Sequence, residues 1–131
     1  AKTLFPYTTL FRSCWSMPGW ACPRTPAKSW NGATLPAYGD GQAEISIVRY
    51  RFDPGASIPM HMHPVINAGV LLSGQLSITT KSGETIVVRA GDPLVELFRE
   101  WHSGSNSGKE PADLIVVYAG TVGTPLVIRE K

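Results

Sequence analysis

The sequence predicts an all-β protein, built as an antiparallel sandwich or barrel of short strands. Apolar and polar residues alternate in several short segments, which is the period of a half-buried strand. Glycine and proline are frequent, with 13 and 11 residues among 131, and they fall between those segments as turns do. No segment shows a convincing helical period. The length suits one domain with a single core.

The strands are expected in a fixed order along the chain. Residues 42–52 alternate with a slip near Val48, which indicates a bulge, and a turn follows at residues 53–55. Residues 68–80 are expected to form two paired strands with a turn at Gly74. Further strands are predicted over residues 84–89, 94–102, 113–119 and 125–129, with a Gly/Ser/Asn loop over residues 103–108.

The segment before the strands has a different composition. Residues 17–41 are rich in Trp, Pro, Gly and Ala and keep neither the strand nor the helix period. We therefore expect an irregular N-terminal arm that wraps over a β-barrel domain of residues 42–131.

The first residues do not read as native protein. Residues 3–13, TLFPYTTLFRS, look like the in-frame translation of a widely used sequencing adapter. We expect residues 1–16 to be a non-native leader and the gene to come from a metagenome. Cys14 then lies in the non-native part, which weakens the case for a disulfide with Cys22. We expect a secreted protein whose signal peptide was lost with the native N-terminus.

Charge and hydropathy exclude two classes of partner. The net charge is +2 and the basic residues form no run, which argues against a nucleic-acid partner or an anionic membrane surface. No apolar run approaches the roughly 18 residues of a membrane span.

The histidines form a pattern typical of a metal site. The sequence has three, His61, His63 and His102. His61 and His63 lie two residues apart, so on a strand they point to one face, and Asn67 keeps that parity. Three imidazoles on facing strands suit copper, zinc, iron, nickel or manganese. The alternative is a barrel that binds no metal and holds a small ligand or none.

Two acidic residues share the strand parity of His102. Glu96 is the stronger candidate, as an acid/base group, a displaced carboxylate ligand or a partner that orients a histidine. Glu100, nearer the rim, is the weaker one. For both, the alternative is a solvated strand face. For Asn67, the alternative to a weak ligand or nearby polar group is an ordinary hydrogen-bonded core residue.

These motifs resemble the two signatures of the cupin superfamily. The first, Gly-x5-His-x-His with a Glu and a later Gly, is matched by Gly55, His61, His63 and Gly74, with Asn67 at the Glu position. The second, Gly-x5-Pro-x-Gly followed by His-x3-Asn, is matched by Gly83, Gly91, His102 and Asn106, with Arg89 at the proline position. The resemblance covers about residues 42–129. It implies a jelly-roll barrel with a metal inside, commonly assembled as a homodimer.

The replacement of Glu by Asn67 moves the expected metal from iron or manganese toward copper, with nickel and zinc behind. The whole looks similar to compact metagenomic copper cupins that cleave cellulose oxidatively. That resemblance implies a copper oxidoreductase that uses O2 or H2O2 on a polysaccharide. His61, His63 and His102 would hold copper, and Glu96 or Asn67 would position oxygen species or protons. The alternatives are an Fe/Mn dioxygenase or a metal-dependent isomerase acting on a small molecule, and a non-catalytic ligand-binding cupin.

Overall fold

The structure is a computed structural model that describes residues 27–131. The described part contains nine β-strands and no helix, so the all-β prediction is confirmed. Accordingly, it offers no helix that could cross a membrane. The adapter-like segment and both cysteines lie outside the described residues. The strands are β1 (Ala43–Phe52), β2 (Ser57–Met62), β3 (Ile66–Ser73), β4 (Gln75–Thr80), β5 (Thr85–Arg89), β6 (Pro93–Val95), β7 (His102–Ser105), β8 (Ala112–Thr121) and β9 (Ile128–Arg129).

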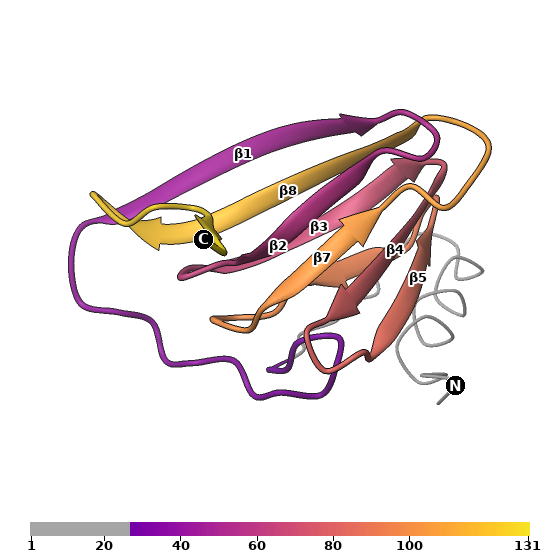
Figure 1. Ribbon diagram of the computed structural model, residues 1–131. Helices are drawn as coiled ribbons and strands as arrows, with labels where there is room; N and C mark the ends of the chain where they lie inside the picture. Colours follow the sequence, from indigo (N-terminus) through magenta and orange to yellow (C-terminus); the bar gives the residue numbers. More distant parts are fainter. Residues whose placement is uncertain (1–26) are drawn as a thin grey trace, which may run out of the picture.

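The strands form two antiparallel sheets, which face each other as two layers in Figure 1. One sheet has the order β1-β8-β3-β6 and the other the order β5-β4-β7-β2-β9. Apolar side chains from both inner faces fill the space between them, as in other sheet-on-sheet packings. The largest fully buried apolar side chains are Leu71, Leu94 and Leu97. This is the predicted jelly-roll architecture.

The predicted bulge near Val48 is absent. β1 pairs with β8 in unbroken register from Ala43 opposite Thr121 to Phe52 opposite Ala112. Val48 belongs to the half-buried inner row of β1, whereas Ile45 and Ile47 are 60% and 71% exposed. The apparent slip arose because the outer face of this sheet also carries apolar residues, so the alternation of residue types does not follow the alternation of burial.

Gly74 marks a change of sheet, where a turn between two paired strands was predicted. β3 and β4 belong to different sheets and do not pair. Gly74 has φ of 75°. A Cβ there would lie 2.6 Å from the carbonyl oxygen of Pro111 and 2.7 Å from Cα of Ala112. Glycine is therefore required both by the backbone angle and by the close approach of the chain before β8.

The predicted strand over residues 94–102 is interrupted, and the predicted loop over residues 103–108 begins inside β7. The chain leaves one sheet after β6 and enters the other at β7. Between them, Arg99 has φ of 53° and its N–H donates to the carbonyl of His63 over 2.8 Å. A residue in the left-handed region cannot continue a strand, so the predicted strand cannot run through Arg99. The apolar residues at 94–98 are buried or half-buried without forming one continuous strand.

The arm over residues 27–41 lies outside the two sheets but is attached to them. Trp30 is 3% exposed within the core, and its N–H donates to the carbonyl of Val95 over 3.0 Å. Ser29 Oγ donates to the carbonyl of Glu96 over 2.9 Å. The arm therefore holds the backbone of a candidate site residue. The proposed division of the chain at residues 16 and 41 stays a prediction.

Candidate metal centre

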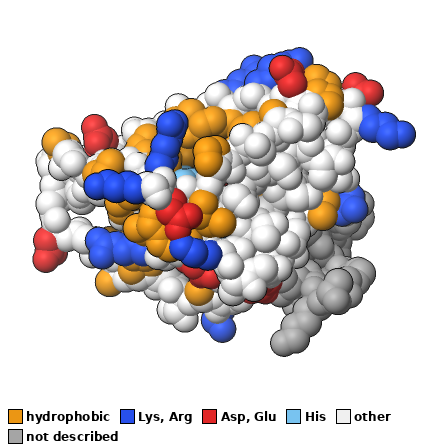
Figure 2. All heavy atoms as spheres, viewed as in Figure 1, with side chains coloured by type: hydrophobic (Ala, Val, Ile, Leu, Met, Phe, Trp, Pro, Cys, Tyr) orange, Lys and Arg blue, Asp and Glu red, His pale blue; other side chains and the backbone are white. Residues whose placement is uncertain are grey.

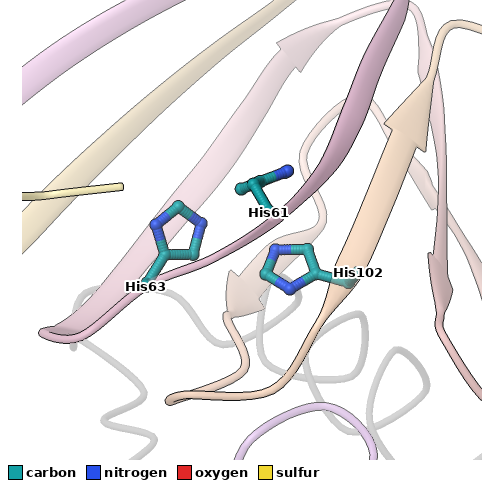
Figure 3. Close-up of side chains that lie close together, drawn as sticks. All are labelled: His61, His63 and His102. Atoms are coloured by element: carbon teal, nitrogen blue, oxygen red, sulfur yellow. The ribbon is translucent and has the colours of Figure 1, made fainter. Parts of the chain in front are cut away.

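The structure brings the three histidines together. His61 lies in β2, His63 directly follows that strand, and His102 begins β7. One ring nitrogen of each lies within 4.8 Å of the others, and Figure 3 shows the three rings grouped around one point. All three are buried, with exposed fractions of 7%, 5% and 2%. This is the convergence expected of a metal site.

The main chain fixes the orientation of each imidazole. In all three, Nδ1 lies within hydrogen-bond distance of a backbone carbonyl oxygen. The partners are Pro59 for His61 at 2.7 Å, Leu126 for His63 at 2.9 Å and Glu100 for His102 at 2.8 Å. A carbonyl only accepts, so Nδ1 carries the hydrogen and Nε2 is the nitrogen available to a metal. Metal-ligating histidines are commonly held in this way.

Glu96 lies beside His102. Its Oε2 atom is 3.2 Å from Nε2 of His102, and the side chain is buried. The pair is close enough for an ion pair, yet neither atom has a partner with hydrogen-bond geometry among residues 27–131. Oδ1 and Nδ2 of Asn67 are likewise buried without a partner in that part of the chain. Orphaned polar atoms around three inward-facing Nε2 atoms fit a bound cation.

Burial and the carboxylate set the charge of these groups. Burial lowers the pKa of His61 and of His63, so both are neutral, as ligands must be, at pH 7. Burial also opposes the charge of His102, but Glu96 outweighs it and raises the pKa of His102. Burial opposes the charge of Glu96 too, and His102, with smaller contributions from the other two histidines, outweighs it and lowers the pKa of Glu96. The metal-free site therefore favours a Glu96–His102 ion pair.

Asn67 faces the same cavity as His61 and His63, but the parity argument that predicted this is wrong. β2 and β3 belong to opposite sheets, and the chain turns between them at residues 63–65. Asn67 therefore reaches the cavity from the sheet across from His61. The cavity is about 470 Å³ and is lined by both residues and by Glu96.

Two other residues of the predicted motifs lie outside this cavity. The Glu100 carboxylate accepts a hydrogen bond from Nδ2 of Asn31 over 2.8 Å. Asn106 is buried and holds a loop, since its Nδ2 donates to the carbonyls of Phe52 and Glu110 and its Oδ1 accepts from the N–H of Gly108. Asn106 has the contacts of a structural residue.

Sequence reasoning missed two parts of the site. The hydroxyls of Tyr50 and Tyr118 lie 2.9 Å apart, and the Tyr118 ring is 5.6 Å from that of His63. Burial and the Tyr50 hydroxyl raise the pKa of Tyr118. Arg129 of β9 also lines the cavity. The alternation of residues 112–121 assigns Tyr118 an inner face, but no spacing shows that β9 pairs with β2.

Figure 2 shows a histidine at the bottom of an opening that is bordered by hydrophobic and basic side chains. The cavity is therefore open to solvent at one side, while His61 and His63 in its lining remain buried. His102 lines a smaller adjoining cavity of about 30 Å³, which shares His61 and Glu96 with the first.

The cupin domain family model matches residues 48–118, which is more than half of the chain and includes all five predicted site residues. No curated protein matches the chain in sequence. Among solved structures, an uncharacterised conserved protein with a double-stranded β-helix domain from Klebsiella pneumoniae has 26% identity and a TM-score of 0.56, over 71% of this chain and 89% of that one. A conserved protein of unknown function from Streptococcus pyogenes has 25% identity and a TM-score of 0.52, over 58% and 64% of the two chains.

Enzymes are also among the similar structures. Oxalate oxidase in complex with the substrate analogue glycolate has 25% identity and a TM-score of 0.55, over 79% of this chain and 56% of that one. The chain thus spans less than two thirds of the S. pyogenes protein and of oxalate oxidase. A DMSP lyase from Ruegeria pomeroyi, at 16% identity and a TM-score of 0.56, shares the fold.

Proposed function

The chain belongs to the cupin domain family, and from this premise we propose that it is a metal-dependent oxidoreductase whose ion is held by His61, His63 and His102. The observation that carries the proposal is the cluster of three buried histidines, with one ring nitrogen of each within 4.8 Å of the others and each Nδ1 tied to the main chain. Such a set binds a divalent transition metal and leaves room for another ligand.

Copper is the metal that we propose first. Three imidazole ligands follow the general order of affinity, in which Cu(II) binds most tightly among first-row divalent ions. When bound, copper would cycle between Cu(II) and Cu(I) and react with O2 or H2O2. The Asn67 amide, buried and without a partner among the described residues, is placed to donate a hydrogen bond to an oxygen species or a substrate.

Glu96 is the residue proposed to hold and move protons. Its carboxylate lies 3.2 Å from Nε2 of His102 and borders the cavity. A carboxylate whose pKa is lowered is ionised at pH 7, so it can accept a proton that a reacting group gives up. This is the role of a general base next to the reacting atoms.

The substrate must enter the cavity, because the histidines are at most 7% exposed. A small molecule, or the free end of a polysaccharide such as cellulose, fits a space of about 470 Å³. The flat surface of a fibre would not reach the histidines. We therefore propose oxidation of a small molecule or of a chain end.

Glu96 also favours a second candidate, a cupin dioxygenase that uses iron or manganese on a small molecule. Asn67 stands at the family's Glu position, yet Glu96 supplies a carboxylate beside His102 from another segment. A set of three histidines and one carboxylate suits these harder ions better than a neutral set does.

Metal analysis with electron paramagnetic resonance separates the two candidates. We expect the purified protein to take up one copper ion per chain with an axial Cu(II) spectrum. His61→Ala should lose that spectrum, while Asn31→Ala, outside the cavity, should keep it. Tight stoichiometric iron with no copper uptake would favour the dioxygenase, and failure to bind any of these metals would contradict both.

The substrate is tested with the loaded protein and a reductant. Oxidised oligosaccharides released from cellulose, detected by mass spectrometry and absent in His61→Ala, would support action on a chain end. Turnover of small phenols or organic acids without such products would assign the small-molecule reaction.

A further inference from the structure

A row of cross-strand neighbours runs through the site. Arg129 of β9 is paired directly opposite His61 of β2, and His61 is paired opposite His102 of β7. Residues directly opposite in antiparallel strands share a face, with Cβ atoms about 5 Å apart. The Arg129 side chain therefore starts on the cavity side of the sheet next to His61. Exposure rises along the row, from 2% at His102 to 7% at His61 and to the exposed Arg129.

The backbone around Arg129 is held in place. The N–H of Glu130 donates to the carbonyl of Met60 over 3.1 Å, and the carbonyl of Leu126 accepts from Nδ1 of His63 over 2.9 Å. The segment that carries Arg129 is thus joined to β2 on one side and to His63, directly after β2, on the other. Arg129 occupies a fixed position at the mouth of the cavity.

The guanidinium of Arg129 has no ion-pair partner among residues 27–131. Arg49 and Arg51 both pair with Asp113, and Lys81 pairs with Glu130, but no described carboxylate pairs with Arg129. The acidic residue in the cavity, Glu96, is beside His102 instead. A guanidinium fork that lines a cavity without a partner is a ready site for an oxyanion.

The remaining walls are largely apolar. The same cavity is also lined by Ile58, Leu114, Val116 and Val127. The strands of Arg129 and His102 are two inter-strand spacings apart, about 10 Å, which is the length of a small ring with a polar group at each end. One guanidinium, with the Glu96 carboxylate deeper in the cavity, balances a singly charged carboxylate better than a doubly charged phosphate.

We propose that the cavity binds a small organic acid with an apolar body, whose carboxylate is held by Arg129 at the mouth and whose other end reaches the histidines. This inference rests on the proposed function only where it assigns a reaction to the end of the acid that lies near the histidines. Arg129 is a specificity-determining residue, and the inference favours a small acid over an uncharged glucan chain.

The test uses two probes of one shape, 4-hydroxybenzoate and its neutral amide, 4-hydroxybenzamide. Each is titrated calorimetrically into the metal-free and the Zn(II)-loaded protein, because zinc does not oxidise the probe. We expect the acid to bind about tenfold more tightly than the amide, as a charge-assisted pair requires. Arg129→Gln should abolish that preference and leave the amide affinity unchanged. Arg129→Lys, which keeps the charge but loses the fork, should restore part of it.

The control is Arg89→Gln, an exposed arginine at the end of β5 that does not line the cavity. It should keep the full preference for the acid. A preference that survives Arg129→Gln, the absence of any preference in the natural chain, or binding of neither probe would overturn the inference. Tighter binding of phenyl phosphate than of 4-hydroxybenzoate would overturn the choice of a carboxylate.

The proposed metal site can be refuted independently of the proposed role of Arg129. Absence of metal uptake would contradict the proposed function, while titration of the metal-free protein would still measure the role of Arg129. Normal metal uptake with an unchanged acid preference in Arg129→Gln would overturn the role of Arg129 alone.

Discussion

Replacement of Gly74 by alanine tests how the chain crosses between the two sheets. The φ of 75° at this position costs an L-residue about 1–2 kcal/mol. The new Cβ would also lie 2.6 Å from the oxygen of Pro111 and 2.9 Å from Cβ of Ala112, well inside normal contact. Relief requires a shift of the backbone before β8, and such overpacking costs about 1–3 kcal/mol more. The expected loss in the free energy of unfolding is about 2–5 kcal/mol.

Gly55→Ala is the matched control. Gly55 has φ of 79°, and a Cβ there would meet nothing within 4 Å. It should lose only the conformational part, about 1–2 kcal/mol. The difference between the two variants isolates the close approach at Gly74.

The assay is urea unfolding of the chelator-treated protein, followed by the fluorescence of its tryptophans, of which Trp30 is 3% exposed. Typical domains have about 5–15 kcal/mol in total, so the loss at Gly74 is large enough to move the midpoint clearly. If Gly74→Ala is no less stable than Gly55→Ala, the reasoning about the crossing is wrong.

Three further predictions concern the site. In the metal-free protein the pKa of His102 is raised and the pKa of Glu96 is lowered. Their ion pair therefore stabilises the fold at pH values above the ordinary carboxyl pKa. That stabilisation is lost as the pH rises past the raised pKa of His102. Glu96→Gln should therefore cost about 3 kcal/mol near pH 6 and clearly less near pH 9, and equal costs in urea unfolding at both would contradict this. Tyr118→Phe removes the hydrogen bond to Tyr50 and should cost about 1 kcal/mol by the same assay, whereas a neutral effect would show that the bond contributes nothing. Asn67→Asp should raise the affinity for Mn(II) about tenfold in competition with a chelating dye, and an unchanged affinity would show that Asn67 is too far from the ion to act.

The three histidines were the most predictable part of the site. His61 and His63 lie two residues apart at the end of β2, and a period of two is enough to predict that they share a face. Glu96 lies near His102, but the parity count that suggested this ran through a segment in which Arg99 has φ of 53°. The strand predicted across that segment failed for a physical reason. The irregular segment at residues 96–98, which directly follows β6, is as well buried as a strand and carries similar apolar side chains, so composition does not distinguish the two.

Contacts between distant segments could not be predicted in this way. Asn67 reaches the cavity because the chain changes sheets, and Arg129 does so because β9 pairs with β2. Such pairings depend on how the sheets close, which a local period does not contain. Likewise, Gly74 looked like a hairpin turn because both a turn and a crossing demand a positive φ.

The three carbonyls that hold the imidazoles have a consequence for how this site can change over generations. Pro59, Leu126 and Glu100 act on the histidines through main-chain oxygens, which every amino acid carries. Substitution at these three positions can therefore preserve the orientation of the ligands wherever the backbone path is preserved. The histidines therefore need no particular side chain at these three positions to keep their orientation. Other residues that line the cavity, such as Asn67 and Arg129, can therefore change without disturbing the orientation of the three imidazoles.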